Sequence, residues 1–170
     1  LGAGSGEKLS FDAEQFPYLT AEMAGGLQVT AHRRPFVSAE DILAMAVCRL
    51  GSGANLLGYY MYHGGTNPEG RASTLQESRE TGYANDLPVY SYDFQAPLGE
   101  YGRVQESFYR LKPLHQMLEQ FGGLIAERNP EFPAENAVSP EEEERPRTAF
   151  RRKEGEEGGF FFYNFYQRHG

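Results

Sequence analysis

The chain lacks several features that define common classes of protein. It has 170 residues and a single cysteine, Cys48, so it cannot form an internal disulfide bond. No stretch approaches the roughly 18 apolar residues of a membrane-spanning helix. The net charge of −8 argues against a nucleic-acid or anionic-membrane partner, because such partners need basic patches on the protein. We therefore expect no nucleic acid and no membrane among its partners.

Motifs for metal ions and cofactors are also missing. The four histidines have no spacing typical of metal ligands, and the glycine pairs match neither a dinucleotide-binding motif nor a phosphate-binding loop. No Gly-x-Ser-x-Gly motif indicates a serine hydrolase. The sequence therefore predicts neither a metal nor a cofactor, which leaves carboxylate chemistry on a neutral substrate. The chain begins with Leu1 rather than Met and shows no signal-peptide pattern, so we expect a piece of a longer protein whose compartment stays open.

An aromatic segment with an abrupt end is the most informative feature that is present. Residues 55–63 predict a buried parallel strand, rich in tyrosine, and Gly64-Gly65-Thr66-Asn67 follows it directly. Glycines let the backbone turn or let a ligand come close, while Thr66 and Asn67 offer hydrogen bonds. Tyrosine combines a flat apolar face with a hydroxyl, which suits a sugar ring. This strand end therefore predicts the rim of a carbohydrate site.

The tyrosines of this strand are expected to divide between its two faces. Alternate side chains of a strand point the same way, so Tyr60 and Tyr62 should share a face, opposite Tyr59 and Met61. One of these faces would point into the site, and the other would pack under helices.

A strand–helix–strand unit leads into this rim. Residues 16–23 predict a strand, and 38–51 a helix that begins with a capping box of Ser38 and Asp41 and ends at Gly51. Such a unit predicts two parallel strands with a right-handed crossover. Their carboxyl ends then meet at one edge, which is where (β/α) folds place their active sites.

Two polar residues lie at this predicted edge. Glu22 stands near the end of an apolar strand, where a carboxylate is costly to bury. It is either a catalytic group or a partly exposed glutamate paired with Arg33 or Arg34. His63 would orient either Glu22 or a sugar hydroxyl.

The rest of the chain is predicted to hold a second helix and a β domain. Pro113 should kink or break that helix, and Gly122-Gly123 should end it. The downstream elements are, in order, a loop over 66–92, a helix from about Arg103, a linker or surface excursion over 127–148 and a strand over 158–166.

Three segments, in this order, give the chain a family resemblance. They are Ala21-Glu22-Met23-Ala24-Gly25-Gly26, then Tyr60-Met61-Tyr62-His63-Gly64-Gly65-Thr66-Asn67, and then Ser91-Tyr92-Asp93-Phe94-Gln95-Ala96-Pro97-Leu98-Gly99-Glu100. Together they resemble glycoside hydrolase family 35, the retaining β-galactosidases, over roughly residues 16–125. The terminal aromatic segment also resembles the early β domain of longer bacterial members.

The resemblance implies an α/β fold, the last quarter of a (β/α)8 TIM barrel followed by the start of a β-sandwich-type domain. Residues 16–23 would be strand seven of the barrel and 55–63 strand eight, and the helix from 103 would close it. The implied domains are 1–126 for the barrel part, 127–148 for a linker or surface excursion and 149–170 for the start of the β domain. The remainder of the barrel, upstream of Leu1, would be the chain's own partner.

The family's catalytic roles carry over to one residue here. Glu22 falls on the nucleophile, and retaining hydrolysis needs a second carboxyl group about 5–5.5 Å away as acid/base. In the family that group is the Glu of an Asn-Glu pair, which this sequence lacks, so it is expected upstream of Leu1. Asp93 and Glu100 are close in sequence to the motifs, but the family pattern gives them no such role.

The family's sugar contacts carry over in part. Tyr60 matches a tyrosine that contacts galactose, and Asn67 and Tyr92 match further motif positions. Phe94 stands where many members have a second sugar-contacting tyrosine, and Gln95 where they have Asp. These departures put one hydroxyl contact in question.

The resemblance therefore implies part of a glycosidase that hydrolyses terminal β-D-galactosides, with retention, through a covalent glycosyl-enzyme. Its partner would be a β-galactoside-containing oligosaccharide or glycan. The alternatives are a carbohydrate-binding protein without catalysis and an inactive truncated homologue.

Overall fold

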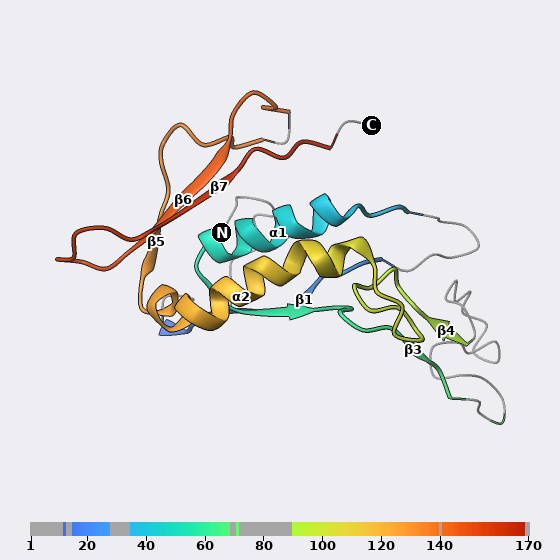
Figure 1. Ribbon diagram of the computed structural model, residues 1–170. Helices are drawn as coiled ribbons and strands as arrows, with labels where there is room; N and C mark the ends of the chain where they lie inside the picture. Colours follow the sequence, from blue (N-terminus) through green and yellow to red (C-terminus); the bar gives the residue numbers. More distant parts are fainter. Residues whose placement is uncertain are drawn as a thin grey trace.

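The computed structural model describes residues 12, 15–27, 35–68, 71, 90–139 and 141–168, which form a mixed α/β structure with small sheets (Figure 1). No closed barrel occurs within these residues. Its elements are β1 (Tyr18–Met23), α1 (Ala39–Gly51), β2 (Ala54–Tyr59), β3 (Gly65–Thr66), β4 (Ser91–Tyr92), α2 (Glu106–Ala126), β5 (Asn129–Glu131), β6 (Arg147–Arg152) and β7 (Phe160–Asn164). Neither helix in the described part of the chain is long and apolar enough to cross a membrane.

The predicted strand–helix–strand unit is confirmed. Strands β1 and β2 pair in parallel, with Met23 opposite Tyr59, so their carboxyl ends lie at the same edge. Helix α1 connects them. Its capping box is present: the Asp41 amide donates to Ser38 Oγ at 3.1 Å, and the Ser38 amide donates to Asp41 Oδ2 at 2.9 Å.

Both helices cover the same face of the β1–β2 pair (Figure 1). The core between them is formed by the buried side chains of Met23, Ile42, Ala46 and Leu111. The opposite face is uncovered: Leu19 and Leu56, which are neighbours across the two strands, are 53% and 50% exposed. An apolar pair exposed in the middle of a parallel sheet is unusual, because parallel sheets are normally covered on both faces.

Helix α2 differs from its prediction at three points. It begins at Glu106 rather than near Arg103, it is continuous through Pro113, and it runs past Gly122-Gly123 to Ala126. Pro113 is exposed, so the carbonyl that loses its helical hydrogen bond there faces water. Tertiary packing overrides these local signals, since Leu111 and Ile125 are buried on either side of them.

The C-terminal strands form an antiparallel sheet in the order β5-β6-β7. Strand β7 confirms the predicted strand, whereas β5 lies inside the segment that we predicted as a linker or surface excursion. The division into domains stays a prediction. The sheet packs on the end of α1, where a Cβ added to Gly51 would lie 3.0 Å from the Cβ of Phe162.

A buried arginine fastens this sheet to α1 and β2. Arg151 is only 1% exposed, and its guanidinium donates to the carbonyls of Leu50, Ala54 and Arg128 and to Asn55 Oδ1, at 2.8–3.2 Å. Leu50 belongs to the last turn of α1, where the helix dipole favours a positive charge. Burial lowers the pKa of the Arg151 guanidinium.

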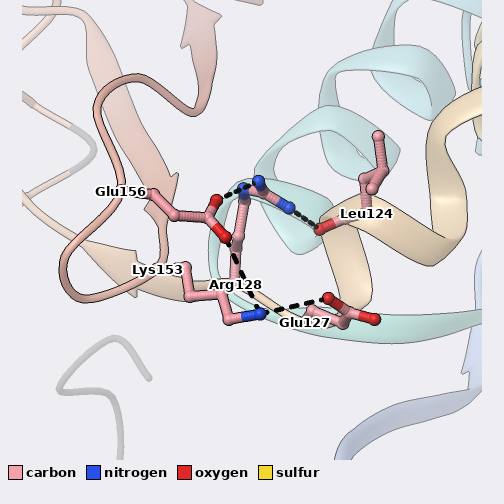
Figure 2. Close-up of polar contacts among 5 residues, drawn as sticks. All are labelled: Leu124, Glu127, Arg128, Lys153 and Glu156. Atoms are coloured by element: carbon pink, nitrogen blue, oxygen red, sulfur yellow. Dashed lines mark hydrogen bonds and ion pairs between the residues drawn. The ribbon is translucent and has the colours of Figure 1, made fainter.

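A second arginine makes the corresponding contact at the end of α2 (Figure 2). Arg128 donates to the Leu124 carbonyl at 2.6 Å and pairs with Glu156 at 2.5 Å. Lys153 lies 3.5 Å from Glu127 and 3.7 Å from Glu156. The loop between β6 and β7 is therefore tied to the C-terminus of α2.

Candidate functional site

Three segments meet at the carboxyl edge of the β1–β2 pair: the turn after β1, the turn after β2 and residues 92–99. The Tyr60 amide donates to the Met23 carbonyl at 2.8 Å, which extends the pairing of β1 with β2 to the start of the turn after each strand. A Cβ on Gly25 would overlap the Met61 carbonyl oxygen, and one on Gly26 would overlap that of Phe94. The glycine pair is therefore what allows these backbones to pack directly on one another.

Glu22 lies on β1, one residue before the end of the strand, and its side chain is exposed. Its neighbour Met23 is buried under the helices, whereas the Glu22 side chain is open to solvent. Within the described part of the chain, Glu22 forms no hydrogen bond or ion pair. Arg33 and Arg34, its alternative partners, lie outside the described residues.

Tyr60, Tyr92 and Phe94 form one aromatic cluster beside β1. The ring centroids of Tyr92 and Phe94 are 4.3 Å apart, and those of Tyr60 and Phe94 5.6 Å. Tyr60 and Tyr92 also contact each other through their hydroxyls. Phe94 is buried and Tyr60 is 38% exposed, so Phe94 forms the base of the cluster and Tyr60 its accessible part.

The predicted sharing of a face by Tyr60 and Tyr62 is wrong. Tyr62 instead packs with Tyr59, at a centroid distance of 5.4 Å, and both rings contact His115 of α2. The strand ends at Tyr59 and the chain turns at Tyr60 and Met61, so strict alternation no longer applies beyond that point. Of Tyr59, Tyr60 and Tyr62, it is Tyr60 that contacts Tyr92 and Phe94.

The second aromatic group, formed by Tyr59, Tyr62 and His115, also contains polar atoms. Tyr59 Oη and His115 Nε2 are 2.8 Å apart. Burial raises the pKa of both Tyr59 and Tyr62 and lowers the pKa of His115. Tyr59 and Tyr62 pack against the core cluster of Met23, Ile42, Ala46 and Leu111.

His63 and Asn67 lie on the segment that follows β2. His63 is exposed, its Nδ1 contacts the Gly64 carbonyl, and among the described residues it has no hydrogen bond to Glu22. Asn67 is 8% exposed, and its amide N–H donates to the Tyr90 carbonyl at 2.8 Å. Its side-chain Nδ2 is buried without a partner in the described structure, so one donor there is unsatisfied.

The two other carboxylates near the site are already engaged. Asp93 accepts hydrogen bonds from the backbone amides of Glu100, at 2.7 Å, and Gln95, at 3.2 Å. Glu100 accepts from the Thr66 hydroxyl, and this bond holds the pKa of the Glu100 carboxyl below its usual value. Asp93 therefore stabilises the 93–100 turn, and Glu100 links the end of this turn to Thr66 of β3.

The sequence pattern did not reveal what Gln95 does. Its Nε2 donates to the Leu27 carbonyl and to the Pro35 carbonyl, both at 3.0 Å. These acceptors lie 68 and 60 positions away along the chain. No local signal marks such a contact, because it exists only once the three segments have come together.

The exposed Glu22 carboxylate and the Tyr60–Tyr92–Phe94 cluster lie on segments that meet at the carboxyl edge of the β1–β2 pair. Within the residues that the structure describes, no three His, Cys, Asp or Glu side chains group in a way that could hold a metal ion.

Known proteins resemble this chain over the same region. The sequence profile of the glycosyl hydrolases family 35 matches residues 6–118, which include all three segments of the site. Beta-galactosidase 10 of Arabidopsis thaliana is 33% identical over 100 residues. That alignment covers 58% of this chain but 12% of the plant protein, so the chain spans about an eighth of the length of this relative. The chain belongs to glycosyl hydrolase family 35.

Proposed function

We propose that this chain carries the nucleophile and part of the sugar-binding surface of a retaining β-galactosidase. The observation that carries the proposal is the position of Glu22: it is exposed, without a partner among the described residues, at the carboxyl edge of a parallel strand pair. The Tyr60 amide of the Tyr60–Tyr92–Phe94 cluster bonds the carbonyl of the next residue, Met23. Active sites of (β/α) barrels occupy this edge. Family membership supports the galactoside as the substrate class.

The proposed reaction has two displacement steps. Glu22 attacks the anomeric carbon of the terminal galactose while a carboxylic acid protonates the departing glycosidic oxygen, which gives a covalent glycosyl-enzyme and the free aglycone. The resulting carboxylate then removes a proton from water, whose oxygen attacks the same carbon and releases Glu22. Two inversions leave the product with the configuration of the substrate.

The acid/base carboxyl group is proposed to come from chain outside the described residues. The Asp93 carboxylate accepts a hydrogen bond from the Glu100 amide, and the Glu100 carboxylate accepts one from the Thr66 hydroxyl. We therefore assign neither of them as the catalytic partner of Glu22. The exposed Leu19–Leu56 pair fits the same proposal, since β1 and β2 would be strands seven and eight of a barrel. Further barrel strands would then cover these leucines.

The sugar ring is proposed to stack on the aromatic cluster, with Tyr60 as its main contact and Phe94 beneath. Tyr92 supports Tyr60 through its hydroxyl. Asn67 and His63 lie on the segment leaving β2. His63 is exposed and would offer a hydrogen-bonding group to ring hydroxyls, whereas Nδ2 of Asn67 is buried beneath this surface. Phe94 lacks the hydroxyl of the family's tyrosine, so this contact with the sugar is apolar only.

Glu22→Gln in the complete protein that contains this chain tests the proposal. Turnover of an aryl β-galactoside should fall on the order of 10⁴-fold, as expected when a member of a catalytic unit is removed. A 2-deoxy-2-fluorogalactoside with a good leaving group should label the wild-type protein on the peptide containing Glu22. Glu119→Gln, an exposed glutamate on α2, is the matched control and should leave turnover unchanged. Labelling elsewhere, or full turnover by Glu22→Gln, would contradict the assignment.

A carbohydrate-binding protein without catalysis is the second candidate. It is favoured by one observation: the carboxylates of the 93–100 turn are both engaged, whereas the aromatic surface is accessible. Galactose binding that depends on Tyr60, together with no turnover of any galactoside, would support this function over hydrolysis.

A further inference from the structure

The side-chain amide of Gln95 links residues 92–99 to two points of the β1–α1 connection. Gln95 directly follows Phe94 of the aromatic cluster, and its Nε2 donates to the carbonyls of Leu27 and Pro35. Its backbone amide donates to Asp93 Oδ2 at 3.2 Å. We infer that Gln95 is a positioning residue that sets the aromatic cluster at its place beside Glu22. This inference rests on the proposed function, because it assigns Gln95 to the same sugar site.

The chemistry of these contacts requires an amide. Both partners of Nε2 are backbone carbonyl oxygens, which only accept hydrogen bonds, and a primary amide supplies two N–H donors from one nitrogen. A carboxylate of the same size has no donor and would set negative charge against two carbonyl dipoles.

The backbone at this point needs support from its surroundings. Phe94 and Gln95 have φ angles of +56° and +55°, in the left-handed region that residues with a Cβ rarely adopt. Gly26 packs its backbone against the carbonyls of both residues. A turn of this kind persists when neighbouring contacts determine it, and the Gln95 amide and Gly26 supply them.

The inferred role predicts a particular kinetic effect. The cluster contacts the sugar in the ground state as well as in the transition state, so displacing it weakens binding in both. Glu22 itself is held by the pairing of β1 with β2, which Gln95 does not touch. Loss of the amide donors should therefore raise KM more than it lowers kcat.

Two substitutions in the complete protein test the inference. Gln95→Glu and Gln95→Met both remove the donors at nearly constant size, and only the first adds a charge. Each should raise KM for an aryl β-galactoside roughly tenfold, with kcat within about threefold, as expected for two lost hydrogen bonds. Gln116→Met, which alters an exposed glutamine of α2, is the matched control and should change neither constant.

Hydrogen exchange supplies a readout that does not depend on activity. The amides of residues 24–27 and 92–98 should exchange faster in both Gln95 variants than in the wild type, while those of β6 and β7 should not. Unchanged exchange, or a KM that rises in Gln95→Glu alone, would overturn the inference. A wild-type protein that turns over no galactoside would instead refute the proposed function, and the exchange data would still decide the role of Gln95.

Discussion

The two ends of the β1–β2 pair use their polar groups in opposite ways. At the start of β2, the buried Arg151 guanidinium donates to the carbonyls of Leu50 and Ala54 and to the side chain of Asn55. At the carboxyl end, Glu22 has no partner within the described structure and Asn67 Nδ2 is unsatisfied. Polar groups at the first end therefore bond one another, whereas at the second end the exposed Glu22 carboxylate and the buried Asn67 Nδ2 have no partner among the described residues.

The largest stability effect should come from breaking the first end. Arg151→Met removes a buried cation and leaves several buried acceptors without donors, which should lower the free energy of unfolding by about 2–4 kcal/mol. Urea denaturation of both proteins would measure this loss. Arg152→Met is the control: its 3.5 Å pair with Glu131 is exposed, so its effect should stay within about 0.5 kcal/mol. Equal losses in the two variants would show that Arg151 does not fasten the sheet.

A smaller effect, confined to the other end, is expected for Gly26→Ala. The new methyl group would overlap the Phe94 carbonyl, and pushing the 92–95 turn outward should cost about 1–3 kcal/mol. KM for a galactoside should rise at the same time, because Phe94 carries the aromatic cluster. Gly123→Ala meets no atom within 4 Å inside α2 and should be neutral or stabilising. If Gly26→Ala leaves both stability and KM unchanged, the close packing at this edge is not required.

The smallest effect should be a pH dependence from the core between the two ends. Burial lowers the pKa of His115 in the folded state below the value of about 6.5 expected for an exposed histidine. As the pH falls through that value, the unfolded chain therefore binds more protons at His115 than the folded chain does. This contribution to stability is complete above that pH and is lost as the pH falls toward the folded-state pKa. His115→Gln should therefore flatten the decline of stability between pH 7 and 5, as followed by thermal unfolding. An unchanged pH profile would show that His115 titrates alike in both states.

The elements that could be predicted from sequence are those whose signals are local. The capping box of Ser38 and Asp41 acts over three residues, and it marks the start of α1 correctly. The apolar stripe of that helix and the apolar residues leading to Tyr59 in β2 are also short-range patterns, which is why their order and the parallel pairing were confirmed. The end predicted for α2 at Gly122-Gly123 was wrong, as was a break at Pro113, because burial of Leu111 and Ile125 outweighs local propensity.

The candidate site was predictable only as a set of residues at one edge. Glu22, Tyr60, Tyr92 and Phe94 were expected there, and the structure brings the three aromatic rings together beside β1. The facing of the tyrosines was not predictable, since the turn at Tyr60 and Met61 interrupts the alternation on which the prediction depended. Roles in catalysis and sugar binding stay proposals.

The sequence by itself determined the types and order of the main elements, the edge at which the motifs gather and the family to which they belong. Only the tertiary structure decided that Tyr60 packs with Tyr92 and Phe94. The same holds for the hydrogen bonds of Gln95 to the β1–α1 connection and those of Arg151 to the end of α1 and the start of β2. The physical reason is the distance along the chain over which each kind of interaction acts. Periodicity and capping act between residues a few positions apart, whereas these contacts join residues up to about a hundred positions apart, after folding has brought them within hydrogen-bonding distance.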